Sequence, residues 1–382
     1  MPRGKTVTQT AQIETANKKP YNAYLDVLKG FAILLVVLGH SIQSFASGGQ
    51  YDSNILFRII YSFHMPLFMF LSGAAAAYSL RPMNGVFLKR KFSMLVVPFM
   101  AWYVLGYFLT GSYHQTHFAT YIHAAIVSPD HGLWFLWVLF LNFCCLAFIK
   151  KLQPKLGIWA YPIVWLMVYA FPTGKYGIGL VKWHLPFFAA GYLIFLYREQ
   201  LARFRKVALY LSVASFPILA ATWHRLYFPS PVSNLNGHLI AHHLNVLRLG
   251  DVLTFNTYAI ASMAYTYIVP FAGIGFVYWL FQLKPAQYTW KILSLAGLYT
   301  LDIYVVHMYF FRFAMGTSWS AIATGFVIAL SCALATGIVI LRRVPVLSTI
   351  LLGGRAAAPK LSFKLPIRFK RIIPLRERPQ EA

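Results

Sequence analysis

The stretch Tyr24-Leu-Asp-Val-Leu-Lys-Gly-Phe-Ala-Ile-Leu-Leu-Val-Val-Leu-Gly-His40 decides the fold class of this chain and indicates where its chemistry lies. It is apolar enough to cross a membrane as a helix, yet it carries an acid, a base and a histidine. At about 100° per residue, Lys29 and His40 differ by roughly 20° around the helix, and Asp26 and His40 differ by roughly 40°. The three side chains therefore share one stripe about 20 Å long, which we expect to line the interior of a helix bundle.

The composition is that of a polytopic membrane protein. Of the 382 residues, 59% are hydrophobic, and apolar runs long enough to span a bilayer recur along the chain. The formal charge of +25 does not indicate a nucleic-acid partner, because the Lys and Arg residues fall mainly between the apolar runs, on alternate loops. No metal site is expected, since the cysteines lack zinc-ligand spacing and no acid or cysteine accompanies the loop histidines His238, His242 and His243.

The apolar runs predict an all-α bundle of about ten membrane spans. The spans are expected at about 25–45, 55–79, 92–110, 132–149, 156–172, 179–197, 207–222, 255–281, 292–311 and 320–341. An inside N-terminus places most of the 34 basic residues on inner segments, so both termini are expected in the cytoplasm. The predicted organisation is a flexible N-terminus at 1–20, the bundle at 21–342 and a basic, lipid-contacting cytoplasmic tail at 343–382.

Histidines gather on the outer side of the predicted bundle. Five are expected at or above mid-membrane there: His40, His64, His131, His184 and His307. His40 is the strongest candidate for a general base, because it shares its stripe with the other ionisable residues; the alternative is a histidine satisfied by a hydrogen bond within the bundle. His64 and His307 belong either to a substrate pocket or to the packing of the bundle. Asp302 and His307 lie roughly 140° apart on a helix, so they are not expected to pair.

Three consecutive basic residues, Lys89, Arg90 and Lys91, begin the third predicted span. One interpretation is a clamp on an anionic cofactor that arrives from the cytoplasm. The other is an ordinary anchor on the inner side of the membrane, and topology alone favours this second interpretation.

Two motifs now indicate a family. They are Leu25-Asp-Val-Leu-Lys-Gly-Phe-Ala-Ile-Leu-Leu-Val-Val-Leu-Gly-His40 and Tyr61-Ser-Phe-His-Met-Pro-Leu-Phe-Met-Phe-Leu-Ser-Gly73. Weaker ones follow in the same order: Leu133-Trp-Phe-Leu-Trp137, Leu185-Pro-Phe-Phe-Ala-Ala-Gly-Tyr192 and Leu301-Asp-Ile-Tyr-Val-Val-His307. From about residue 21 to 342 the chain resembles acyltransferase family 3, the integral-membrane O-acyltransferases of bacterial surface sugars. It is most similar to the branch described as fucose 4-O-acetylase-like.

The resemblance implies a ten-helix bundle, acyl-CoA as the cytoplasmic donor and a sugar hydroxyl as the acceptor. Lys29 stands where the family usually has Arg, which keeps the charge but loses the two-pronged fork of donors. Where the family often has Arg-x-x-Arg, this chain has Arg90 followed by Ser93. The second donor contact is therefore expected from Lys89 or Lys91.

These observations predict a membrane-embedded O-acyltransferase of the bacterial inner membrane. His40 is expected to take a proton from a sugar hydroxyl that attacks the thioester directly, and an acyl-histidine intermediate is the alternative. Asp26 is expected to pair with Lys29 or to orient a neighbour. The donor, acetyl-CoA, is expected as a substrate and not as a tightly bound cofactor.

The acceptor is expected to contact His64, His307 and Trp134. A second interpretation, from another class of protein, is a transporter or flippase that moves a lipid-linked sugar without changing it. A polar interior stripe and helices with internal proline suit such a protein too, whereas the absence of an inverted repeat in the sequence counts against it.

Overall fold

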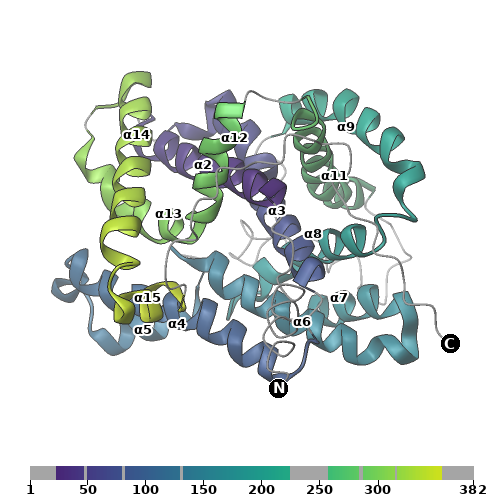
Figure 1. Ribbon diagram of the computed structural model, residues 1–382, viewed down its shortest axis with the longest axis horizontal. Helices are drawn as coiled ribbons and strands as arrows, with labels where there is room; N and C mark the ends of the chain where they lie inside the picture. The colour runs from purple at the N-terminus through teal and green to yellow at the C-terminus, as the bar shows by residue number, and fades with distance from the viewer. Residues whose placement is uncertain are drawn as a thin grey trace, which may run out of the picture.

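The computed structural model describes residues 23–46, 50–79, 82–129, 132–223, 257–283, 287–314 and 316–354. Within these ranges the chain is helical and contains no strand, which confirms the predicted all-α class (Figure 1). The terminal segments, Asp130, His131 and the loop histidines His238, His242 and His243 lie outside the described residues.

The described helices fall into a longer and a shorter group. The longer ones are α2 (Ala23–Phe45), α3 (Ile55–Ser79), α4 (Gly85–Leu109), α6 (Trp134–Leu156), α8 (Ile178–Leu196), α9 (Ala202–Thr222), α11 (Thr257–Leu280) and α14 (Trp319–Thr336). The shorter ones are α5 (Phe118–Val127), α7 (Ala160–Ala170), α12 (Gln287–Leu298), α13 (Thr300–Val306), the 3₁₀ segment η6 (His307–Phe313), the π-helical turn η7 (Gly337–Leu341) and α15 (Pro345–Leu352).

Membrane-spanning helices dominate this fold. Seven helices of the described chain are long and apolar enough to cross a membrane, and counting one bent helix pair as a span gives eight. Apolar side chains remain exposed on the peripheral helices, above all on α9, as expected where a helix faces lipid. The protein is therefore a multi-pass membrane protein, while the count of ten spans and the orientation of the termini stay predictions.

Gly157 folds a long apolar stretch back on itself. It has a φ of 56° and separates α6 from α7. Beyond the end of α7, the backbone carbonyl of Tyr176 accepts a hydrogen bond of 3.0 Å from the indole of Trp137, near the start of α6. The two helices are thus antiparallel. With 11 residues α7 is too short to cross a membrane by itself, so the separate spans at 132–149 and 156–172 stay a prediction.

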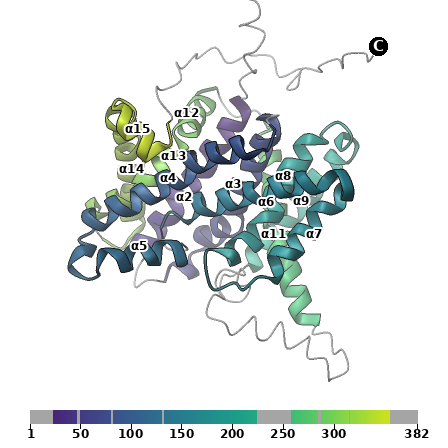
Figure 2. The ribbon, with the colours of Figure 1, turned by 90° about the horizontal axis from the view of Figure 1, so that it is seen from below.

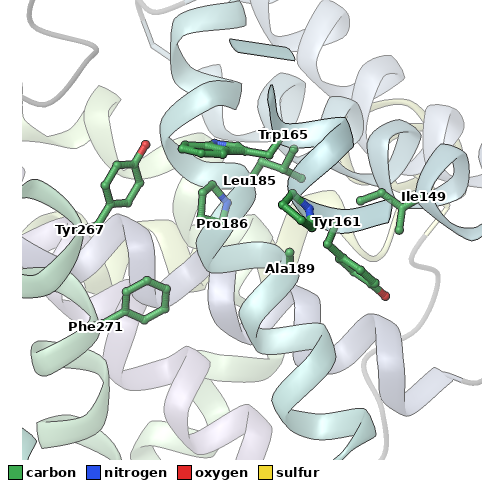
Figure 3. A pocket seen from close by; sticks show the side chains of 9 residues that line it. Ile149, Tyr161, Trp165, Leu185, Pro186, Ala189, Tyr267 and Phe271 are labelled. Carbon is green, nitrogen blue, oxygen red and sulfur yellow. The ribbon is translucent and has the colours of Figure 1, made fainter. Parts of the chain in front are cut away.

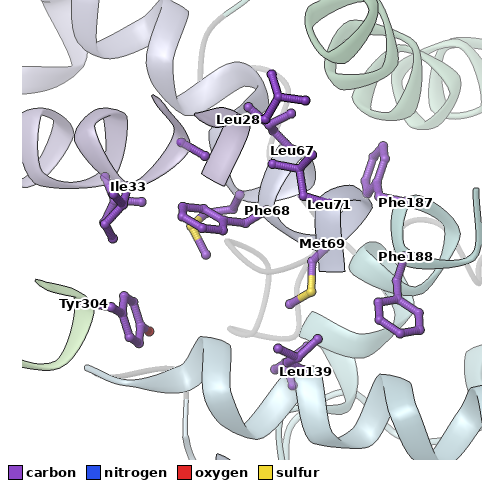
Figure 4. Close-up of a cluster of buried hydrophobic side chains, with 14 of the residues drawn as sticks. Leu28, Ile33, Leu67, Phe68, Met69, Leu71, Leu139, Phe187, Phe188 and Tyr304 are labelled. Atoms are coloured by element: carbon purple, nitrogen blue, oxygen red, sulfur yellow. The ribbon is translucent and has the colours of Figure 1, made fainter. Parts of the chain in front are cut away.

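Helices α2 and α3 lie at the centre of the molecule in both views, with α12–α14 on one side and α8, α9 and α11 on the other (Figures 1 and 2). Large apolar side chains fill the space around α3. Figure 4 shows Phe68 and Met69 of α3 with Phe187 and Phe188 of α8 in this buried cluster.

Glycine permits the closest of these helix contacts. A Cβ atom at Gly73 of α3 would collide with the carbonyl oxygen of Phe188, and one at Gly191 of α8 would collide with that of Phe70. Small residues let backbones approach closely in membrane bundles, where packing contributes more than the hydrophobic effect. These two glycines fix α8, and with it His184, against α3.

The same device holds α2 against α12. A Cβ at Gly30 would collide with the carbonyl oxygen of Leu293, and one at Gly297 with that of Asp26. This contact fixes the half of α2 that carries Asp26 and Lys29. The other half, which carries His40, packs against α3, α14 and η6.

A buried ion pair supports the break between α12 and α13. The guanidinium of Arg342 donates two hydrogen bonds of 2.8 Å to the carboxylate of Asp302, and both side chains are almost fully buried. Arg342 also donates to the carbonyl oxygen of Leu298, where α12 ends. Asp302 is therefore occupied by Arg342, consistent with the expectation that it does not pair with His307.

Candidate functional site

Four of the five predicted histidines converge inside the bundle. They come from four different elements: His40 from α2, His64 from α3, His184 from α8 and His307 from η6. The imidazole rings of His40 and His307 lie 5.4 Å apart between centroids. His64 lies near both His40 and His184. The structure thus brings together residues that the sequence placed only at a similar depth.

The backbone fixes the tautomer of three of these histidines. The Nδ1 atoms of His64, His184 and His307 each lie 2.7–2.9 Å from the carbonyl oxygen one turn earlier. A carbonyl oxygen only accepts, so each Nδ1 carries the hydrogen, and Nε2 of the neutral ring holds the free lone pair. For His184 and His307, Nε2 is buried and has no hydrogen-bond partner within the described part of the chain.

His40 is the one member of the cluster whose Nδ1 contacts a side chain. Its Nδ1 lies 3.2 Å from Oε1 of Gln43, one turn further along α2. The hydroxyl of Tyr61 on α3 donates to the same oxygen, also at 3.2 Å. His40 is half-buried, whereas the other three histidines are buried. The predicted base is therefore held by a polar side chain at the more accessible edge of the cluster.

Aromatic side chains border the histidines. The ring of Trp134, predicted to contact the acceptor, lies 5.1 Å from that of His184. Tyr304 lies 6.4 Å from His307, and its hydroxyl accepts a hydrogen bond from the backbone N–H of Phe135. Of the three predicted acceptor residues, the structure thus places His64 and His307 within the cluster and Trp134 at its border.

Asp26 and Lys29 form a separate part of the stripe. Nζ of Lys29 lies 3.2 Å from Oδ1 of Asp26, and the lysine side chain remains 30% exposed. The rise of a helix separates Lys29 from His40 by about 16 Å along α2. The predicted pairing of these two residues is present, but their catalytic role stays a prediction.

The three basic residues at the start of α4 have different surroundings. Lys89 and Arg90 are exposed, in the second turn of the helix after the Asn84 cap. Lys91 is half-buried, with Nζ 3.9 Å from the ring centroid of Phe143 on α6, which is a cation–π contact. Lys89 and Arg90 are therefore the members free to reach an anion in solution.

One cavity opens next to the His40 end of α2. It has a volume of about 330 Å³ and is lined by Phe45, Ala46, Gln50, Ser53, Asn54, Thr317, Ser318, Trp319 and Ile322. The hydroxyl of Ser41, the residue after His40, donates to the carbonyl oxygen of Ile322 in its wall. This mixed polar and aromatic cavity begins one to two helical turns beyond His40.

A second cavity is almost entirely apolar. It has a volume of about 280 Å³ and lies between α6, α7, α8 and α11, with side chains such as Trp165, Leu185 and Phe271 around it (Figure 3). It contains no histidine, although Leu185 follows His184 directly in the chain.

Most of the chain matches the model of a known protein family. Residues 22–342 match the acyltransferase domain of acyltransferase family 3. The chain belongs to this family. The matched range includes both motifs, the one that carries His40 and the one that carries His64.

The chain is also similar, at low sequence identity, to two curated proteins. The chain is similar to the nodulation protein NolL of Mesorhizobium japonicum (26% identity over 193 residues) and to that of Sinorhizobium fredii (26% over 187 residues). The matched stretch is 44% of this chain and 46% or 47% of the relatives, so it spans a little under half of their length. No solved structure is detectably similar to the chain.

Three residues of the cluster were not predicted to act together with His40. His184 was recognised only by its depth, because its place beside His64 depends on the glycine contact between α3 and α8. Gln43 and Tyr61 were not singled out at all. Gln43 carried a signal, since it lies three residues after His40 and such pairs meet on a helix surface.

Proposed function

We propose that this acyltransferase moves an acyl group, acetyl in the simplest case, from acyl-CoA to a hydroxyl of a cell-surface or lipid-linked sugar in a bacterial inner membrane. The observation that supports it best is His40. In a chain of this family, it is the accessible member of a buried cluster of histidines. A neutral imidazole in such a place is suited to take a proton from a hydroxyl near pH 7.

The proposed reaction is a direct transfer. Nε2 of His40 accepts the proton of the sugar hydroxyl, while the oxygen of that hydroxyl attacks the carbonyl carbon of the thioester. The C–O bond forms, the C–S bond breaks, and the electron pair leaves on the sulfur of CoA. The proton held by His40 then passes to that thiolate or to water, which restores the neutral base.

The donor and the acceptor are proposed to approach from opposite ends of α2. Lys89 and Arg90 are exposed cations suited to the phosphates of CoA, whose pantetheine arm would extend along α2 past Lys29. We expect the acceptor sugar in the mixed cavity beyond His40, where Trp319 and hydroxyl and amide side chains lie together.

Mass spectrometry of surface glycans tests this function. A strain that lacks the gene is complemented with wild type, His40→Ala or His123→Ala, the last being a control at an exposed histidine on α5. We expect an acetyl-sized mass on a sugar with wild type and His123→Ala and its loss with His40→Ala. Identical glycan masses with all three, together with a change in glycan export, would favour the transporter instead.

A further inference from the structure

Gln43 and Tyr61 do more than pack beside His40. Oε1 of Gln43 lies 3.2 Å from Nδ1 of His40 and 3.2 Å from the hydroxyl of Tyr61. An amide oxygen has two lone pairs and accepts from both neighbours at once. In this structure the hydroxyl of Tyr61 donates to Oε1, so the oxygen of Gln43 and not its NH₂ group lies at this junction.

The arrangement has a backbone cause. Gly39 precedes His40, and a Cβ there would lie only 2.8 Å from Cε2 of Tyr61. The missing side chain lets the tyrosine ring rest against α2, with its hydroxyl at the level of Gln43. The ring is held from the other side by Phe57, stacked on it with centroids 3.9 Å apart.

We propose that Gln43 and Tyr61 are positioning residues that set the tautomer and orientation of His40. With Nδ1–H donated to Gln43, the lone pair lies on Nε2, the nitrogen that faces away from its own helix turn. Without this acceptor the proton is free to occupy either nitrogen, and a share of the rings would present N–H where a base is needed. The inference rests on the proposed role of His40 as a base.

The surroundings contain few other charges to compete with this contact. The titratable side chains described on the elements packed against α2 are Arg58, Tyr61, His64 and Tyr78 of α3, Asp302 and Tyr304 of α13, His307, Tyr309 and Arg312 of η6, Cys332 of α14, and Lys291 of α12. Arg58 donates to the carbonyl oxygens of Trp223 and Ala221. Asp302 is bound to Arg342, and α12 packs at the far half of α2. Gln43 is thus the hydrogen-bond partner of His40 Nδ1 in the described structure.

Label transfer in membrane vesicles tests the inference without knowledge of the acceptor. Vesicles that contain their own glycans receive labelled acetyl-CoA, and incorporation into the glycan fraction is followed from acid to alkaline pH. The variants are Gln43→Leu, Gln43→Glu and Tyr61→Phe. The matched controls are Gln153→Leu, which loses an amide bonded to Lys150, and Tyr265→Phe, which loses a hydroxyl bonded to the backbone of Leu219.

Gln43→Leu is expected to lower kcat on the order of tenfold to a hundredfold, with little change in KM for acetyl-CoA. Tyr61→Phe is expected to lower kcat less, because Oε1 of Gln43 remains as the acceptor for Nδ1–H of His40. Gln43→Glu retains an acceptor for Nδ1–H, so activity at high pH should stay near wild type. Its carboxylate favours the protonated ring, so the acid limb of the profile should shift to higher pH.

A merely structural role would lower the amount of folded protein and leave the pH profile of the remainder unchanged. An unchanged pH profile with Gln43→Glu would overturn the inference. So would a wild-type kcat with both Gln43→Leu and Tyr61→Phe. In either case an inactive His40→Ala variant would leave the proposed function standing. An active His40→Ala variant would overturn both.

Discussion

At the scale of single residues, α2 separates two kinds of chemistry. Its first turns hold the ion pair of Asp26 and Lys29, and its last turns hold His40 with Gln43. About 16 Å of helix lies between Lys29 and His40, so the cation does not contact the base. This spacing suits a reaction in which an anionic donor reaches the interior from one side and a neutral hydroxyl from the other.

Arg90 provides a test of the donor side. Arg90→Ala is expected to raise KM for acetyl-CoA about tenfold, because a charge-assisted hydrogen bond to phosphate is lost, with kcat nearly unchanged. The effect should shrink at high salt, since the side chain is exposed. The measurement is the rate of label transfer at varied acetyl-CoA concentration.

Lys151→Ala is the matched control, because Lys151 is an exposed cation near the end of α6. An equal rise in KM for both variants would show a general effect of surface charge, and Arg90 would then be only a membrane anchor.

The residues that sequence reasoning found and missed differ in a physical way. His40, His64 and His307 were recognisable because a polar ring inside a membrane span is energetically costly and is usually retained for function or for a contact within the bundle. The partners of His40 were less visible, because the Tyr61 contact depends on how closely α3 approaches Gly39. Such approach is set by packing between helices and not by the spacing within one.

At the scale of elements, the ninth predicted span shows what periodicity does not reveal. The run at 292–311 was expected as one helix, but α12 and the α13–η6 segment meet at an angle of 67°. Thr300 donates its hydroxyl to the carbonyl oxygen of Gly297, and Arg342 donates to that of Leu298. These bonds satisfy backbone groups released by the break, as the interior of a membrane requires. The stretch 292–311 contains no proline that would predict this break.

The ion pair beside this break is expected to be important for stability. Arg342→Met or Asp302→Leu should each lower the free energy of unfolding by about 3–5 kcal/mol, because either leaves a buried charge without its partner. The double variant should regain most of this loss, since two apolar side chains replace the pair. Thermal unfolding in detergent ranks the stability of four purified proteins: wild type, the two single variants and the double variant.

Arg198 and Glu199 provide a control, because their ion pair is 3.8 Å long and only partly buried, with Glu199 exposed. Arg198→Met should change stability by about 1 kcal/mol or less. If Arg342→Met proved equally mild, the pair would not be what holds α13 against η7.

At the scale of the whole molecule, the sequence predicted the class of the fold better than its details. Apolar runs and the placement of basic residues were sufficient for an all-α membrane bundle, whereas the turn at Gly157 between α6 and α7 was not predicted. Which helices pack together was not predictable from these runs, because lipid is as apolar as a neighbouring helix. The glycines of α2, α3, α8 and α12 permit the close packing of these helices. The four histidines come together as a result of this packing.

The central claim is that this bundle transfers an acyl group with His40 as the base. The most direct test is the incorporation of labelled acetyl from acetyl-CoA into the glycan fraction of vesicles that contain wild type or His40→Gln. The substitution keeps a polar side chain but removes the base. We predict rapid incorporation with wild type and a rate lower on the order of a hundredfold or more with His40→Gln. Equal incorporation by the two proteins would contradict the account.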